Sequence, residues 1–230
     1  MKTLAIDTSL AIGSVAAADA TRTLQIVLPA AGEHARRIGS ALVAAARGLG
    51  WPVGDVELVG VVRGPGSFTG LRVGLTVAKG IAWAAEAPLV GVSGFDVIAR
   101  RTVRLVEGAA GPVHVAYDAG RGEVFVAEAC PAMGEPTGFR LTPPRLVGSA
   151  AWVADLAPGS LVTGPGLAAL GGALVARPDL AVAPRDAWQP TAEDVVDVAR
   201  LLHAAGMHAP PAALVPDYLR PSYADESKPD

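Results

Sequence analysis

The hydrophobic period of the N-terminal part constrains the fold more than any other feature of this sequence. Three short apolar runs come first, separated by turn-like links, at residues 3–6, 11–18 and 21–28. Runs of this length predict a meander of three strands. The pattern is then helical over 33–49, strand-like over 58–62, helical over 69–85 and strand-like over 88–92. This order predicts a mixed α/β sheet with helices on its faces and argues against a purely parallel sheet.

The pattern restarts after residues 107–111, where the sequence loosens. Two apolar runs, 113–117 and 123–129, flank a turn at 118–122 and predict a hairpin. Beyond the proline- and glycine-rich stretch 131–144, helical and strand character alternates over 150–156, 161–163, 167–175 and 191–205. The second half therefore resembles a smaller version of the first, and we predict an N-terminal lobe at 1–106 and a C-terminal lobe at 107–230. We expect the final helix to pack back on the N-terminal lobe and the tail after it to be mobile.

Composition narrows the class of protein. Hydrophobic residues make up 51% of the chain and charged residues 18%, as in a globular protein. The net charge of −3 leaves no basic excess to bind nucleic acid unaided. The one cysteine, Cys130, excludes an intramolecular disulfide and a cysteine-based zinc site. A reducing compartment, and by default the cytoplasm, is the expected location.

Two segments have features of membrane sequences. Residues 1–18 resemble a secretory signal, but Asp7 lies where such a signal should be uncharged, so we predict a buried strand. Residues 156–176 carry no charge, yet Pro158, Pro165 and several glycines would break a membrane helix. We predict a strand, a turn and a short helix there, and no membrane span.

The most unusual segment is Arg63–Arg72, RGPGSFTGLR. A strand runs through two glycines, Gly64 and Gly66, directly into a helix that Ser67 or Thr69 would cap. Backbone N–H groups at such a helix start favour an anion, whereas the alternative is a tight turn that needs glycine for its dihedral angles. Neither the Walker pattern nor the dinucleotide fingerprint matches.

The end of the first strand carries Asp7-Thr8-Ser9. A carboxylate and two hydroxyls there could hold a magnesium-bound phosphate, but a turn in which these side chains accept backbone hydrogen bonds is the favoured alternative. Two-metal cleavage chemistry is not expected, because Glu33 is the one obvious companion carboxylate. The histidines lack metal-ligand spacing, and no nucleophile elbow is present, so we predict no catalytic residue and no metal site.

The helix at 69–85 is apolar nearly all round, with a narrow polar stripe of Arg72, Thr76 and Lys79. Such a helix must be covered on two sides. One side can be its own sheet, and the other needs either a second layer of the same domain or a partner protein. Small residues would allow another helix to approach closely, namely Gly70, Gly74, Ala78 and Ala82.

Several motifs, taken in order, resemble the bacterial TsaB family, formerly YeaZ. They are residues 4–9 (LAIDTS), 33–34 (EH), 63–72, 91–93 (GVS), 118–119 (DA) with 122–124 (GEV), and 218–220 (YLR). The resemblance implies the two-lobed actin-like fold of Hsp70 and sugar kinases, in which each lobe is built on a ribonuclease-H-like sheet. One departure is Asp118-Ala119-Gly120-Arg121, where the arginine is shifted by one place from the pattern usual in relatives.

The resemblance also implies a role. TsaB proteins are dimerisation subunits that bind and activate TsaD, which transfers threonylcarbamoyl to the adenosine beside the tRNA anticodon, and the ATPase TsaE joins them. TsaD carries a His-x-x-x-His metal motif, whereas here Ile38 follows His34 at that spacing, so this chain resembles the scaffold. We expect tRNA contact only through the complex, and a homodimer when the chain is alone. The resemblance places the TsaD interface on the first two helices, and the expected interface residues are Glu33, His34, Arg37, Ala41, Gly70, Arg72, Val73, Gly74, Val77, Ala78 and Ile81.

Two other classes of protein stay open. An actin-like ATPase or kinase would bind ATP or ADP with magnesium through the two loops, using Asp7, Thr8, Ser9, Gly64, Gly66, Ser67 and Thr69. The scaffold requires no cofactor and would keep these loops as vestiges. A peptidase, the older description of such relatives, would need a nucleophile or ligand set that the sequence does not offer.

Overall fold

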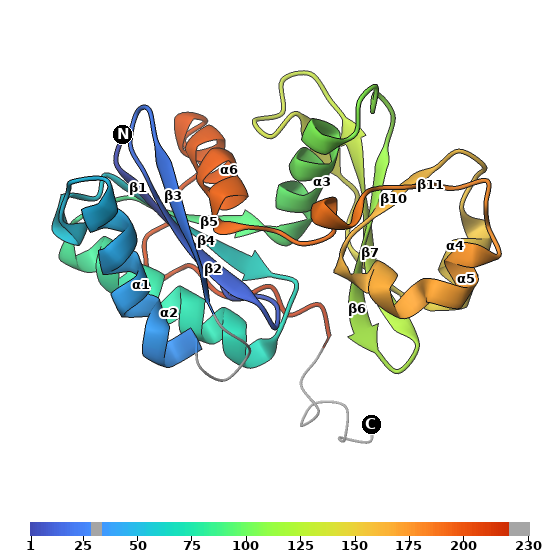
Figure 1. Ribbon diagram of the computed structural model, residues 1–230, viewed down its shortest axis with the longest axis horizontal. Helices are drawn as coiled ribbons and strands as arrows, with labels where there is room; N and C mark the ends of the chain where they lie inside the picture. Colours follow the sequence, from blue (N-terminus) through green and yellow to red (C-terminus); the bar gives the residue numbers. More distant parts are fainter. Residues whose placement is uncertain (29–33, 221–230) are drawn as a thin grey trace.

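The computed structural model describes residues 1–28 and 34–220, and its chain forms two sheets side by side (Figure 1). The first sheet has the order β3-β2-β1-β4-β5. Its strands are β1 (Thr3–Asp7), β2 (Gly13–Ala18), β3 (Thr23–Leu28), β4 (Leu58–Gly64) and β5 (Leu89–Ser93). The first three form the expected antiparallel meander, and β4 and β5 run parallel to β1. The predicted mixed sheet is confirmed.

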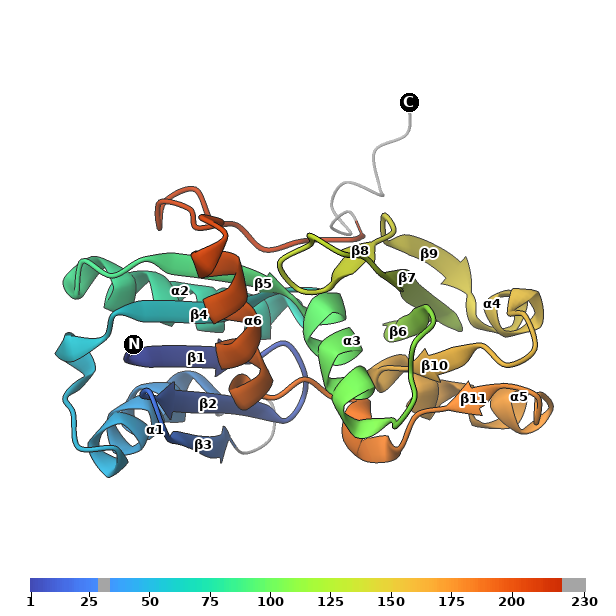
Figure 2. The same cartoon turned by 90° about the horizontal axis from the view of Figure 1, so that it is seen from above.

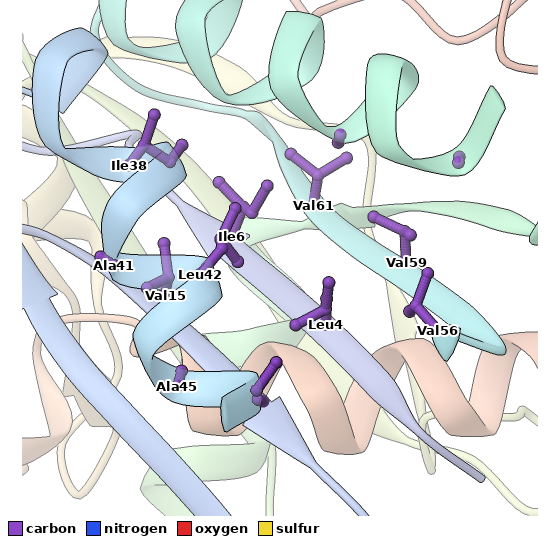
Figure 3. Packing of buried hydrophobic residues seen from close by; sticks show 14 of the residues in the cluster. Leu4, Ile6, Val15, Ile38, Ala41, Leu42, Ala45, Val56, Val59 and Val61 are labelled. Carbon is purple, nitrogen blue, oxygen red and sulfur yellow. The ribbon is translucent and has the colours of Figure 1, made fainter. Parts of the chain in front are cut away.

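Helices cover both faces of this sheet because its strands are apolar on both sides. On one face lie α1 (His34–Gly48) and α2 (Phe68–Ala84), which share a buried cluster with side chains such as Leu4, Ile6 and Val61 (Figure 3). On the other face lies α6 (Ala192–Ala204), which packs on alternate strand residues such as Ala5 (Figure 2). A helix that follows the second sheet in the chain thus lies on the first sheet.

The second sheet has the order β11-β10-β6-β7-β8, with β9 also paired to β7. Its strands are β6 (Val113–Gly120), β7 (Glu123–Pro131), β8 (Phe139–Leu141), β9 (Arg145–Gly148), β10 (Leu161–Thr163) and β11 (Ala181–Val182). The remaining helices are α3 (Gly94–Leu105), α4 (Ser149–Asp155) and α5 (Gly171–Val175), and the 3₁₀ turns are Val53–Asp55, Pro165–Leu170 and Arg185–Ala187. The hairpin is confirmed, with a turn shorter than expected. Strands β8 and β9 lie in and beside the proline-rich stretch, where no strand was expected.

Two connections hold the sheets together. Helix α3 packs on the second sheet through Phe95, Ile98 and Ala99. The first connection is an ion-pair cluster between α3 and α6, in which the buried Asp194 accepts hydrogen bonds from Arg101 (2.7 Å) and Arg104. The second is the segment 214–220, which runs from the edge of β5 to the β6–β7 hairpin (Figure 2). There Leu214 packs over Gly91, and Arg220 pairs with Glu123.

The segment 156–176 forms β10, a 3₁₀ turn and α5, as predicted. No helix within the described residues is long and apolar enough to cross a membrane. The expected mobile tail, at residues 221–230, lies outside the described residues.

Candidate functional site

The two candidate phosphate loops lie in direct contact. Ser67 donates its backbone N–H to the carbonyl of Ser9 (2.7 Å), and the Thr8 hydroxyl donates to the carbonyl of Gly70 (2.7 Å). Ser67, not Thr69, caps α2, because its side chain accepts from the backbone N–H of Gly70. The loop after β1 and the loop after β4 therefore form one packed unit.

Glycine is required in this unit for two reasons. Gly64 and Gly66 have φ values of 149° and 157°, in the region that side chains disfavour. A Cβ atom at Gly66 would also lie 2.4 Å from the Ser9 carbonyl oxygen, and one at Gly70 would lie 2.0 Å from the Thr8 carbonyl oxygen. The tight-turn interpretation of these glycines is thus supported by the geometry.

Asp7 is buried at the centre of the unit. Its Oδ1 accepts hydrogen bonds from the backbone N–H (2.9 Å) and the hydroxyl (2.6 Å) of Ser9. Its Oδ2 has no hydrogen-bond partner among the described residues. Burial raises the pKa of Asp7 to about 6, against the lowering effect of the Ser9 bonds. The buried Tyr117 has a pKa raised above its usual value, first by burial and then by the charge of Asp7.

The C-terminal segment covers the glycine loop from the other side. Asp217 donates its backbone N–H to the carbonyl of Arg63 (2.7 Å), and its carboxylate lies 3.1 Å from the Arg63 guanidinium. A Cβ atom at Gly64 would lie 2.7 Å from the Asp217 carbonyl oxygen. The glycine loop is therefore packed between Ser9 and Asp217.

This packing does not fit a nucleotide phosphate. The backbone N–H of Ser67 and the hydroxyls of Thr8 and Ser9, which would meet phosphate oxygens, already bond within the chain. Asp7, the candidate magnesium ligand, is fully buried. A group of three His, Cys, Asp or Glu side chains suited to a metal does not occur among the described residues.

The predicted loop residues do line a pocket of about 500 Å³ between α1 and α2. Thr8, Ser67 and Thr69 contribute polar groups, and the buried His34 also lines the pocket. The His34 Nε2 atom has no hydrogen-bond partner among the described residues. A larger hollow of about 780 Å³ lies in the second lobe beside His114 and Trp152, and none of the predicted site residues lines it.

The expected interface residues divide into two groups. Arg37, Arg72, Val73, Val77 and Ile81 are exposed or half-buried on the outer side of α1 and α2. The others in the described chain are buried within the monomer: His34, Ala41, Gly70, Gly74 and Ala78. Glu33 lies outside the described residues.

The small residues of α2 therefore have a different role from the expected one. Gly70 and Gly74 lie against Thr8, and Ala78 and Ala82 belong to the core below α2. They allow α2 to approach its own sheet, so the expectation that they serve a second helix layer is wrong. The outer side is instead lined by residues that the sequence prediction missed, Trp83 with 79% exposure and Val43 with 38%. Their helical spacing from the buried positions could have identified them.

A second missed feature is the stack at the start of α2. The Arg72 guanidinium lies 3.7 Å from the centre of the Phe68 ring and donates to the Tyr218 hydroxyl (2.8 Å). Tyr218 stacks on Phe68 with ring centroids 5.0 Å apart. The motif YLR is thus placed beside the outer face of α2, which only the tertiary structure could show.

Comparisons with known proteins agree with this architecture. Residues 27–135 match the family model of TsaD, tRNA N6-adenosine threonylcarbamoyltransferase. The chain is 38% identical to the tRNA threonylcarbamoyladenosine biosynthesis protein TsaB of Escherichia coli over 129 residues, which is 56% of this chain and 54% of that protein. It is 35% identical to TsaB of Haemophilus influenzae over 54% of this chain and 52% of that protein. The chain therefore spans about half the length of these curated relatives.

Solved structures match over a longer range. YeaZ from Pseudomonas aeruginosa superposes with a TM-score of 0.77 at 26% identity, covering 95% of this chain and 99% of that one. The similarity includes both sheets, so the expected two-lobed actin-like fold is confirmed.

Proposed function

Because the chain belongs to the TsaB/YeaZ family, we propose that it is a non-catalytic subunit in the biosynthesis of tRNA threonylcarbamoyladenosine. In this role it binds TsaD, the threonylcarbamoyltransferase, and holds it in an active geometry. The ATPase TsaE joins the complex, and tRNA associates with this chain only through that complex. The chain alone forms a homodimer through the same face and needs no nucleotide.

The outer face of α1 and α2 is the observation that carries this proposal. The α1–α2 face, as we define it, consists of Arg36, Val43, Arg47, Arg72, Val73, Val77, Lys79, Ile81 and Trp83. Tyr218 contacts Arg72 at one end of the face, no other described element lies over it, and Trp83 is 79% exposed. Exposed apolar groups that gather on neighbouring helices are typical of a protein interface. The scaffold role is favoured over the ATPase because the Ser67 N–H and the Thr8 and Ser9 hydroxyls, which a phosphate would need, already bond within the chain.

The experiment is a binding assay with the cognate TsaD. We expect the purified chain and TsaD to elute together in size-exclusion chromatography. Val77→Glu should abolish co-elution because it places a charge among the apolar side chains of the face. The matched control is Val175→Glu in α5, where the side chain is 82% exposed in the other lobe, and it should co-elute normally. Separate elution of the unsubstituted chain from TsaD would contradict the proposal.

A further inference from the structure

The two helices of the α1–α2 face carry basic residues and no acidic ones. Arg36, Arg37 and Arg47 lie on α1, and Arg72 and Lys79 on α2, with no Asp or Glu in either helix. The chain has 19 basic and 22 acidic residues, so the other 14 basic residues share the rest of the chain with all 22 acidic ones. The face is thus positive in a molecule whose net charge is −3.

Four of these cations differ from most other basic residues of the chain, because no described carboxylate pairs with them. Many arginines elsewhere form ion pairs with carboxylates, namely Arg22, Arg63, Arg101, Arg104, Arg140, Arg177 and Arg220. Arg36, Arg47, Arg72 and Lys79 form none with any described residue, and Arg72 is held by the Tyr218 hydroxyl and the Phe68 ring. Among the residues that the structure describes, the charges of Arg36, Arg47, Arg72 and Lys79 are therefore not compensated by a carboxylate.

Helical spacing arranges the charges as two flanks. Arg36, Val43 and Arg47 recur at intervals of seven and four residues on α1, so they share one side of that helix. Arg72, Lys79 and Trp83 have the same spacing on α2. Val77 and Ile81 pack on the core that α1 also covers, and so lie on the α1 side of α2. Val73, Val77 and Ile81, at intervals of four residues, thus form an apolar strip along α2 beside the row of Arg72, Lys79 and Trp83.

We infer that the α1–α2 face fits a protein partner whose matching helices carry aspartate and glutamate beside an apolar strip, and that its charge weakens, without preventing, the proposed homodimer of this chain. This inference rests on the proposed function and adds the chemistry of the partner to it. A two-fold dimer through this face would place the same surface against itself and bring unpaired cations together. Like charges across an interface disfavour binding of the wrong partner, and opposite charges raise the association rate and the affinity of the right partner. The apolar strip favours a protein over a nucleic acid as the partner. A nucleic acid binds through phosphate contacts and base stacking, and neither would bury the aliphatic side chains of Val73, Val77 and Ile81.

The salt dependence of the two pairings tests the inference. We expect the dissociation constant of the complex with TsaD to rise about tenfold between roughly 50 mM and 500 mM salt, because salt screens attraction between exposed charges. Self-association of the chain alone, measured by sedimentation equilibrium, should become stronger over the same range because salt screens the repulsion. Opposite signs of the two salt effects are the expected result.

Arg36→Glu tests the same point without salt. The residue is exposed in the first turn of α1, where a negative side chain favours the helix, so lost binding cannot be assigned to lost helix. We expect about tenfold weaker binding to TsaD in low salt and stronger self-association with the unsubstituted chain, because each substituted copy supplies an acid to the other face. The control is Arg145→Glu on β9, which makes the same change of charge at an exposed position of the other lobe and should alter neither pairing.

The outcomes separate the two proposals. Binding to TsaD that is insensitive to salt and to Arg36→Glu overturns the inference and leaves the proposed function standing. Self-association that weakens with salt in parallel with TsaD binding also overturns it. Absence of TsaD binding at both salt concentrations overturns the proposed function and the inference with it. RNA binding to the isolated chain that Arg36→Glu abolishes would assign the face to nucleic acid and reject the protein partner.

Discussion

At the residue scale, two glycines of the same helix have opposite roles. A Cβ atom at Gly70 would lie 2.0 Å from the Thr8 carbonyl oxygen, whereas one at Gly80 meets nothing within 4 Å. Both lie in α2, so helix propensity alone would favour alanine at each position. The difference between them is the contact with the loop after β1.

Gly70→Ala should therefore destabilise the protein by about 3 kcal/mol, because backbone must move to admit the methyl group. Gly80→Ala should stabilise it by about 0.5–1 kcal/mol through the lower entropy of the unfolded chain. Urea unfolding of both variants measures the two effects. Equal effects would show that the loops are not packed as described.

Asp7 offers a second prediction at this scale, since it is a buried carboxyl with one unpaired oxygen. Its pKa of about 6 in the folded state exceeds the ordinary value of 3.8. Protonation is thus tighter in the folded state, and the contribution to stability is fully present below about pH 3.8 and is lost as pH rises through about 6. The charge of Asp194 adds a smaller rise to the pKa of Asp7, and the charge of Asp7 in turn raises the pKa of Tyr117.

Asp7→Asn keeps an oxygen that can accept both Ser9 bonds but cannot ionise. We expect its stability advantage over the unsubstituted protein to grow from pH 4 to pH 7.5, reaching roughly 3 kcal/mol. Thermal unfolding across this pH range measures the gap. A gap that stays constant with pH would show that Asp7 is not the group whose ionisation opposes folding.

At the scale of elements, α2 separates a core side from a partner side. Ala78 is 0% exposed and Val77, the next residue back, is half-buried beside the α1–α2 face. The family resemblance assigned both residues to the interface, and the apolar pattern of the helix does not reveal which side meets the sheet. The structure places Ala78 in the core.

Ala78→Glu should accordingly destabilise the monomer by about 4 kcal/mol or more, because the new carboxylate would be buried without a partner. Val77→Glu should cost about 1 kcal/mol in stability while it removes TsaD binding. Differential scanning calorimetry and the elution assay together distinguish the two. Similar thermal transitions for both variants would mean that Ala78 is accessible.

At the scale of the whole molecule, a buried carboxylate on α6 joins the lobes. The side chain of Asp194 is 3% exposed and pairs with Arg101 and Arg104 on α3, while Asp197 on the same helix is 51% exposed and pairs with Arg104 alone. Removing one member of a buried pair leaves the other charge without compensation. Exposed pairs contribute little to stability.

Asp194→Ala should cost roughly 3–5 kcal/mol, since Arg101 and the Thr191 hydroxyl lose their acceptor. Asp197→Ala should cost less than about 1 kcal/mol. Hydrogen exchange at α3 and α6 would localise the effect to the junction of the lobes. Equal costs for the two variants would contradict a joining role for Asp194.

Local sequence patterns were enough to predict the elements and much of the fold. The change of hydrophobic period located the meander, the first two helices and the hairpin. Apolar residues recur every two residues in a strand and about every 3.6 residues in a helix, and both repeats are visible in a short stretch of sequence. The two candidate loops were also identified from the sequence, since a carboxylate with hydroxyls and a run of glycines are recognisable at any position. Strands β8 and β9 were missed because pairing with β7, rather than their own pattern, makes them strands.

The contacts between these loops and helices could be known only from the folded chain. The packing of Ser9 and Asp217 on the glycine loop joins residues far apart in the chain, and it uses the donors that a phosphate would need. The orientation of α2, which hides its small residues and exposes Trp83 and Arg72, depends on which side meets the sheet. Burial and charge compensation depend on contacts between residues far apart in the chain. Such contacts leave no repeating pattern in the sequence from which they could be predicted.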